Sequence, residues 1–158
     1  MNKIQEVDKL DRQILSRLMK NAKRPYTDIA QELAVSGGTI HVRMKKLEDS
    51  GVVKGYQLEV DHEKLGFDVC AFLGIYLEKS SMYDEASAQL TLIPEIVAAH
   101  YTTGLYNIFT KVICRDTTHL REVLSKIQSI PGIQRTETFI SLEESINRPI
   151  ELVNERER

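Results

Sequence analysis

The sequence contains no tryptophan and only two cysteines, Cys70 and Cys114. Neither cysteine has a second ligand at metal-binding spacing, so we expect no metal site, and two buried thiols are favoured over a disulfide or a redox switch. No apolar run approaches the roughly 20 residues of a membrane span, and residues 1–6 are charged rather than signal-like. These absences predict a cytoplasmic protein without a metal or cofactor.

The sequence also lacks an arrangement of residues that would support catalysis. Its four histidines are scattered along the chain at His41, His62, His100 and His119. No nucleophile lies beside a base in the pattern, and no glycine-rich phosphate loop is present. We therefore predict that the chain is not an enzyme and has no catalytic residues.

Positive charge is scarce overall but concentrated in one segment. The net charge is −2, yet residues 12–46 contain eight Lys and Arg against two Asp and Glu, which gives +6. Lysine and arginine supply most non-specific affinity for DNA by neutralising phosphates. Charge alone leaves two interpretations open, namely a DNA-binding face and a merely solvated one.

Periodicity in the same segment predicts three short helices. Residues 8–20 carry an apolar stripe that includes Leu10, Ile14 and Leu18, with Asp8 as the cap. A second helix is expected over residues 27–34, with Thr27 as its N-cap. A tight turn over residues 35–39 then leads into a third helix that is capped by Ser36 and ends before Gly51.

The third helix has one apolar face and one short polar face. At about 100° per residue, Ile40, Met44 and Leu47 cluster together, whereas Gly38, His41, Val42 and Lys45 face away from them. A generic three-helix bundle explains the caps and the period, but only a helix-turn-helix also explains the basic, short outer face. We predict these DNA contacts: Arg24, Tyr26, Ser36, Gly38, Thr39, His41, Val42, Arg43, Lys45 and Lys46.

Arg43 stands apart from the other predicted contacts. It lies about 60° from the centre of the apolar face, so it either reaches a phosphate or pairs with an acid of the first helix. We favour the structural role.

The remaining sequence predicts strands and helices in a second domain. A strand is expected over residues 52–60, followed by a polar connector. From residue 68 the order is β-α-β-β-α-β, with strands near 69–77, 96–103, 107–115 and 133–141 and helices near 82–92 and 116–129. This order is that of a ferredoxin-like domain. One face of its sheet is left apolar and uncovered, which favours a dimer.

The fold class is therefore α+β, with an N-terminal winged helix-turn-helix joined to a C-terminal ferredoxin-like domain. We expect a DNA-binding domain over residues 1–61, a linker over 62–67, an effector-binding and oligomerisation domain over 68–145, and a C-terminal tail over 146–158.

The chain resembles the Lrp/AsnC family of feast/famine regulators over residues of about 6 to 145. The resemblance rests on residues 10–15, Ile29-Ala30, Val35-Ser36, Thr39-Ile40-His41-Val42-Arg43, residues 47–53, and Gly104 with Tyr106. Residues 101–104, 126–128 and 136–138 are similar to the branch that regulates asparagine synthesis. Gly37 departs from the pattern, because the family usually has proline there, and a more flexible helix start could loosen the fit to phosphate.

The resemblance implies dimers that assemble further, typically to octamers, with a small amino acid bound between dimers. The best candidate effector is asparagine. The implied effector residues are Tyr101, Thr102, Thr103, Gly104, Leu105, Tyr106, Asn107 and Gln128, with Thr136 and Thr138 as further contributors. Without the resemblance, residues 102–106 are more simply a hairpin turn.

These observations predict a sequence-specific, nucleoid-associated transcriptional regulator of amino-acid metabolism that binds double-stranded DNA. Two alternatives remain at this point. The first is an enzyme that uses the ferredoxin-like domain, but the sequence lacks the catalytic residues that such an enzyme needs. The second is an architectural protein, which would bind promoter DNA and random DNA with equal affinity.

Overall fold

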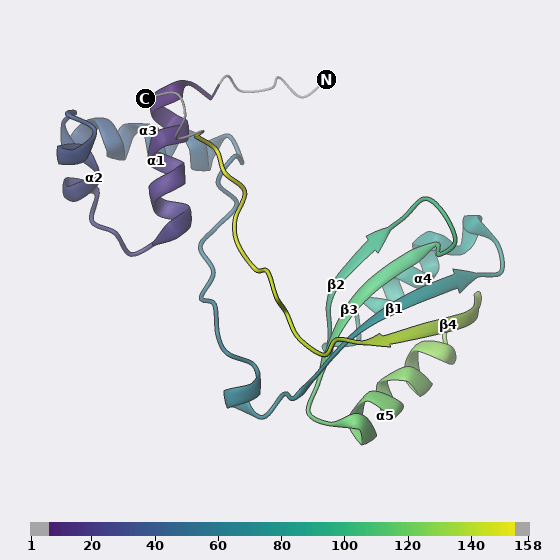
Figure 1. The fold of residues 1–158 in the computed structure, drawn as a ribbon. Helices are drawn as coiled ribbons and strands as arrows, with labels where there is room; N and C mark the ends of the chain where they lie inside the picture. Colours follow the sequence, from purple (N-terminus) through teal and green to yellow (C-terminus); the bar gives the residue numbers. More distant parts are fainter. Residues whose placement is uncertain (1–6, 154–158) are drawn as a thin grey trace. The chain divides into compact units, whose positions relative to one another are not determined.

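The computed structural model describes residues 7–153 and shows two compact units (Figure 1). The first unit runs to Glu59 and is joined by the chain from Ile146 onward, and the second is Val60–Ser145. Residues 1–6, considered above as a possible signal, and residues 154–158 of the expected tail lie outside the described residues. No helix of the described part is long and apolar enough to cross a membrane.

The first unit contains the three predicted helices around one small core. They are α1 (Lys9–Lys20), α2 (Tyr26–Glu32) and α3 (Gly37–Asp49). The predicted apolar faces are buried, with Ile14 and Ile40 fully inaccessible and Met44 and Leu47 nearly so. Because α2 has seven residues, it depends on this packing rather than on its own helical propensity.

Two of the three predicted caps are confirmed. The Asp8 carboxylate accepts the backbone N–H of Asp11, and the Asp11 carboxylate accepts the N–H of Asp8, which completes a capping box. Ser36 caps α3 by accepting the Thr39 N–H at 3.1 Å. The Thr27 cap is wrong, because α2 begins one residue earlier, after Pro25, and has no side-chain cap. Proline at this position already sets a helix-compatible φ.

The strand expected over residues 52–60 is not formed. A strand needs a partner for its backbone groups, and this segment pairs with no strand among the described residues. Its beginning serves to end α3 instead, since the Val53 N–H donates to the Leu47 carbonyl at 3.0 Å. The β-branched composition that predicted a strand therefore reflects partial burial of Val53 against the helical core.

The second unit has the predicted β-α-β-β-α-β order. Its elements are β1 (Val69–Leu77), α4 (Tyr83–Leu90), β2 (Ile96–Tyr101), β3 (Ile108–Cys114), α5 (Thr117–Gln128) and β4 (Ile133–Ile140), with short 3-10 helices at Glu63–Leu65 and Ser80–Met82. The strands form one antiparallel sheet in the order β2-β3-β1-β4. Asp116 caps α5 by accepting the His119 N–H at 2.7 Å.

The two faces of this sheet differ. Alternate residues such as Leu73, Ile75 and Val112 point toward α4 and α5 and are fully buried with them. On the opposite face, which we call the open face, Phe72 stacks on Phe109 with ring centroids 6.0 Å apart. No helix of the described unit packs on the open face, so its aromatic side chains remain partly exposed, as the sequence predicted.

The two cysteines lie on neighbouring strands and point to opposite faces. Val69 pairs with Cys114 and Cys70 pairs with Ile113, so the two thiols alternate across the sheet. Both are free, with Cys114 buried and Cys70 partly buried. Burial raises the pKa of both thiols, which disfavours the thiolate that redox chemistry requires.

The described residues from Ile146 to Val153 lie against the helices of the first unit. The Asn147 amide donates to Glu59 at 3.0 Å. Residues 148–151 and 153 line a groove together with the outer side of α1 and the start of α2, including Arg17 and Arg24. The described residues from Ile146 to Val153, within the expected tail, therefore cluster with the first unit.

Candidate nucleic-acid interface and effector turn

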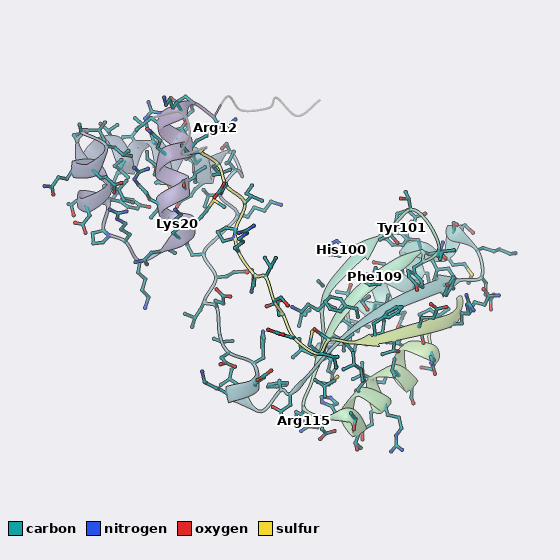
Figure 2. All side chains as sticks on the ribbon, in the orientation of Figure 1. Arg12, Lys20, His100, Tyr101, Phe109 and Arg115 are labelled. Atoms are coloured by element: carbon teal, nitrogen blue, oxygen red, sulfur yellow. The ribbon has the colours of Figure 1, made fainter. Side chains whose placement is uncertain are left out.

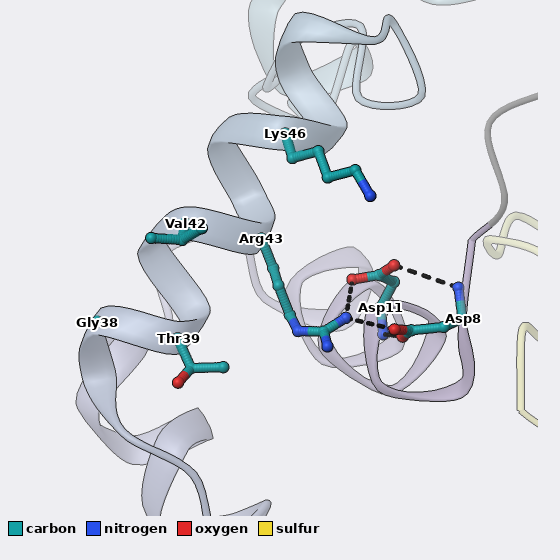
Figure 3. A pocket seen from close by; sticks show the side chains of 7 residues that line it. All are labelled: Asp8, Asp11, Gly38, Thr39, Val42, Arg43 and Lys46. Atoms are coloured by element: carbon teal, nitrogen blue, oxygen red, sulfur yellow. Dashed lines mark hydrogen bonds and ion pairs between the residues drawn. The ribbon is translucent and has the colours of Figure 1, made fainter.

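The outer face of α3 is the face that the sequence predicted to meet DNA. His41, Val42, Lys45 and Lys46 are exposed, and Val42 reaches 70% exposure although it is apolar. Gly38, Thr39, Val42 and Lys46 border a shallow hollow beside the start of α1 (Figure 3). A helix whose exposed face is short and basic can approach a duplex groove closely.

Arg43 points away from this face and toward α1. Its Nη1 lies 2.6 Å from the Asp8 carboxylate and 2.8 Å from that of Asp11, as Figure 3 shows. Asp11 is 5% exposed, so its charge requires this partner. The Asp11 backbone N–H and then the Arg43 guanidinium lower the pKa of the Asp8 carboxyl. Arg43 thus joins α3 to the capping box of α1, the structural role favoured from the sequence.

Arg24, a second predicted contact, also takes part in an ion pair within the unit. The two oxygens of Glu32 bind Arg17 at 2.7 Å and Arg24 at 2.5 Å. Hydrogen bonds from these two guanidinium groups lower the pKa of Glu32. Lys45 and Lys46 on α3, like Arg12, Lys20 and Lys23, stay outside the described ion pairs of this unit. Arg12 and Lys20 project from α1 (Figure 2).

Aromatic residues pack beside the outer face of α3. The ring of Tyr26, at the start of α2, meets His41 edge-on with centroids 4.8 Å apart. The Tyr56 hydroxyl donates to Glu48 at 2.8 Å, and the neighbouring Tyr26 hydroxyl is the main cause that raises the pKa of Tyr56. The sequence did not single out Tyr56 or Glu48. Tyr56 follows the end of α3 by seven residues, and no local pattern pairs it with Glu48.

The predicted effector turn divides into two sets of side chains. Tyr101, Thr103, Gly104 and Leu105 are exposed, whereas Thr102, Tyr106 and Asn107 are half-buried. Gly104 has φ +111°, a conformation that favours glycine and leaves the backbone accessible. The exposed set is therefore the part of the turn that a small ligand can reach.

The half-buried set holds the turn to the sheet. The Thr102 hydroxyl donates to the Tyr106 carbonyl at 2.7 Å. Asn107 accepts the Leu77 N–H on its side-chain oxygen at 2.9 Å and donates its own N–H to the Ile75 carbonyl. These bonds tie the turn to the end of β1, so Asn107 fixes the loop rather than facing solvent.

Tyr106 reaches onto the open face and meets residues that the sequence did not single out. Its hydroxyl donates to Glu137 at 2.7 Å, and the Tyr76 hydroxyl donates to the other oxygen of Glu137 at 3.2 Å. The hydrogen bond to Glu137 raises the pKa of Tyr106 to about 12. That same bond lowers the pKa of Glu137. Alternation along β4 places Glu137 between Arg135 and Phe139 on the open face, but no sequence pattern indicated its partner.

The remaining predicted effector residues lie elsewhere. The Gln128 amide donates to the Thr136 hydroxyl at 3.0 Å, and Thr138 follows on the same face of β4. In the sheet order, β4 and β2 are the two outer strands, roughly 14 Å apart at about 4.8 Å per strand. Within one chain the structure therefore brings Gln128 and Thr136 together but separates them from Tyr101. Among residues 7–153, no group of His, Cys, Asp or Glu is arranged to hold a metal ion.

Both halves of the chain match known families. Residues 7–54 match the winged helix-turn-helix DNA-binding model, and residues 70–150 match the Lrp/AsnC ligand binding domain. The chain is 46% identical over 145 residues to the regulatory protein AsnC of Haemophilus influenzae, covering 91% of this chain and 97% of that protein. It is equally identical to AsnC of Escherichia coli K12, covering 91% and 95%.

Solved structures agree with these matches. The structure of E. coli AsnC superimposes with a TM-score of 0.88 at 44% identity, covering 92% of this chain and 99% of that one. A feast or famine regulatory protein from M. tuberculosis complexed with L-methionine superimposes with a TM-score of 0.84 at 25% identity, covering 90% and 96%. The fold and the order of the two domains along the chain are therefore those of these regulators.

Proposed function

The chain belongs to the Lrp/AsnC family of transcriptional regulators, and on that premise we propose that α3 binds operator DNA and that a small amino acid, asparagine, modulates this binding. The observation that carries the DNA-binding part is the exposed outer face of α3, with Lys45 and Lys46 outside the unit's ion pairs. The names of the AsnC relatives support asparagine. The methionine complex of the M. tuberculosis relative supports an amino acid as the ligand class.

On DNA, the two ends of α3 have different tasks. Ser36 and Thr39, whose hydroxyl oxygens lie 2.9 Å apart, stand at the positive end of the helix dipole and suit a phosphate. His41 and Val42 follow on the outer face, where side chains reach base edges in the major groove. Lys45, on the same face, can neutralise a phosphate. Arg24 and Arg43, already paired within the unit, act mainly by holding α2 and α3 in place.

At the effector turn, the accessible atoms suit an amino acid. The backbone around Gly104 offers N–H groups to a carboxylate without obstruction by a side chain. Hydroxyls such as that of Thr103 and the amide of Gln128 complement an ammonium group and a carboxamide. Because Thr136 and Thr138 lie on β4, three strands away from Tyr101 on β2, and Gln128 is bonded to Thr136, we propose that a neighbouring copy supplies these three residues and that the ligand binds between dimers.

We propose that two copies pair through the open face and that dimers assemble further, to octamers. Phe139 is 48% exposed beside Phe72 and Phe109, and a second copy would remove these rings from water. We assign DNA binding to residues 1–61, a linker to 62–67, effector binding and assembly to 68–145, and a tail to 146–158. The protein would act in the cytoplasm, at the nucleoid.

The test uses the full chain and DNA fragments that it selects from a random library. Fluorescence anisotropy then measures its affinity for a selected fragment and for random DNA, with and without asparagine at several salt concentrations. We expect salt-sensitive binding that prefers the selected fragment and changes with asparagine. Equal affinity for both fragments would indicate an architectural protein. DNA affinity that none of the twenty amino acids changes would reject the proposal that an amino acid is the effector.

A further inference from the structure

Tyr106 belongs to the effector turn, but its side chain lies on the open face of the sheet. The ring packs directly over Gly74 in the middle of β1, where a Cβ would overlap it. It meets Tyr76 edge-on with centroids 5.1 Å apart and also contacts Phe109 at 5.8 Å. Glycine at position 74 therefore leaves the space that this ring fills, because any side chain there would overlap the ring.

The hydroxyl of Tyr106 is already engaged. Glu137 accepts it on one oxygen and accepts Tyr76 on the other. Arg135 lies 3.4 Å from Glu137, and its guanidinium carbon lies 3.9 Å from the centre of the Tyr76 ring. Hydrogen bonds to an ionised carboxylate are stronger than neutral ones, so the Tyr106 hydroxyl is not free to bind a ligand.

The backbone of Tyr106 is fixed together with its ring. The Thr102 hydroxyl binds the Tyr106 carbonyl, and the adjoining Asn107 is anchored to β1. A ligand that moves the exposed residues of the turn must therefore also move Tyr106, and the bonds that hold Tyr106 oppose this movement. The same ring belongs to the aromatic surface that a second copy would cover.

We propose that Tyr106 is a positioning residue, which acts through Glu137 and links the effector turn to the open face. This inference rests on the proposed function and deepens it. Tyr106 shapes the turn for asparagine without contacting it, and covering the open face stabilises the same arrangement. Because such coupling is reciprocal, asparagine and pairing of the sheets strengthen each other.

The experiment is a double-mutant cycle on the full chain. Tyr106→Phe keeps the ring and removes the hydroxyl, and Glu137→Gln removes the charge that this hydroxyl binds. Tyr76→Phe is the matched control, because it removes a hydroxyl from the same carboxylate outside the turn. Three quantities are measured for each variant: the asparagine concentration of half-maximal response, the melting temperature without asparagine, and the dimer dissociation constant.

We expect Tyr106→Phe and Glu137→Gln each to raise the half-maximal asparagine concentration by roughly tenfold. The double variant should be no worse than either single one. Melting without asparagine should stay nearly constant, Tyr76→Phe should resemble wild type, and asparagine should tighten the wild-type dimer more than the variants. Gly74→Ala, which displaces the ring, should reproduce the loss.

Three results would overturn the inference. If the two substitutions raise the half-maximal asparagine concentration additively in the double variant, Tyr106 contacts the ligand directly. If Tyr106→Phe leaves that concentration unchanged, Tyr106 has no positioning role. A fall in melting temperature that accounts for the whole loss of response would make the role merely structural. A wild-type chain that ignores asparagine would instead reject the proposed effector, and this inference with it.

Discussion

Seven buried side chains form the core of the helix-turn-helix unit, whereas fourteen form that of the sheet unit. In the smaller unit, ion pairs run from Arg43 to Asp8 and Asp11 and from Glu32 to Arg17 and Arg24. The sheet unit also has ion pairs, such as Arg135 with Glu137, but they accompany a core of twice as many side chains. A small core buries less apolar surface and depends more on such contacts. We therefore expect ion pairs to contribute a larger share of the stability of the first unit, and apolar packing a larger share of that of the second.

The largest effect is expected from the core of the sheet unit. Leu73 is fully buried between β1 and the helices, so Leu73→Ala should lower the free energy of unfolding by about 3 kcal/mol. Urea titration followed by tyrosine fluorescence measures this, because Tyr76, Tyr83, Tyr101 and Tyr106 belong to this unit. Leu105→Ala, at a position that is 79% exposed, is the control, and equal losses in both would contradict the importance of packing.

The corresponding change in the first unit removes a charge. Asp11→Ala eliminates half of the capping box and one partner of Arg43, which should cost the unit about 1–2 kcal/mol. Urea titration followed by far-UV circular dichroism reports the change. Asp49→Ala, at an exposed position near the end of α3, should have little effect. A harmless Asp11→Ala would refute the dependence of this unit on its ion pairs.

One buried polar group departs from the apolar packing of the sheet unit. The hydroxyl of Thr110, a residue that is 1% exposed, finds no hydrogen-bond partner among the described residues. Thr110→Val keeps the shape and removes the unsatisfied group, so it should raise the free energy of unfolding by about 1 kcal/mol. Urea titration compares it with Thr110→Ser, which keeps the hydroxyl. Destabilisation by valine would reveal a hidden role for the hydroxyl.

Lysines on the outer face of α3 should affect DNA affinity without affecting stability. Lys45→Ala and Lys46→Ala should each weaken binding roughly fivefold on every sequence and lower the salt dependence by about one counterion. Anisotropy titrations at several salt concentrations measure both quantities. Lys54→Ala, outside α3, serves as the control. Unchanged affinity in the α3 variants would show that another face binds DNA.

The smallest effect is expected with acid. Arg17 and then Arg24 hold the pKa of Glu32 below its ordinary value of 4.5, so folding gains stability above that pH and loses it as pH falls through the lower folded pKa. Glu32→Gln should reduce stability near neutral pH and make the acid decline of the first unit shallower. Circular dichroism at stepwise lower pH tests this, and identical slopes would assign the decline to other carboxyls.

Local pattern was sufficient for most elements. Leu10, Ile14 and Leu18 defined α1, and the alternation around Thr110 and Val112 defined β3, because these periods follow directly from helix and strand geometry. The expected strand over residues 52–60 failed for the opposite reason. Its β-branched composition is local, but a strand also needs a partner backbone, which no local pattern supplies.

The candidate sites were harder to predict than the elements. The angle of Arg43 on its helix predicted an acidic partner in α1, whereas no pattern around Arg24 indicated its ion pair with Glu32. Tyr106 and Glu137 are far apart in sequence, and nothing near either residue indicates that they meet. Partners of this kind depend on strand order and register, which only the folded chain defines.

The packing of the Tyr106 ring over Gly74 also limits how such chains can evolve. Neither position can change freely alone, since a side chain at position 74 displaces the ring and a small residue at position 106 leaves a gap over the glycine. Substitutions at the two positions should therefore occur together across related sequences, so that a larger side chain on β1 accompanies a smaller one in the turn. A library that randomises both positions should recover tyrosine with glycine, or a small residue with a larger one, and rarely two large residues.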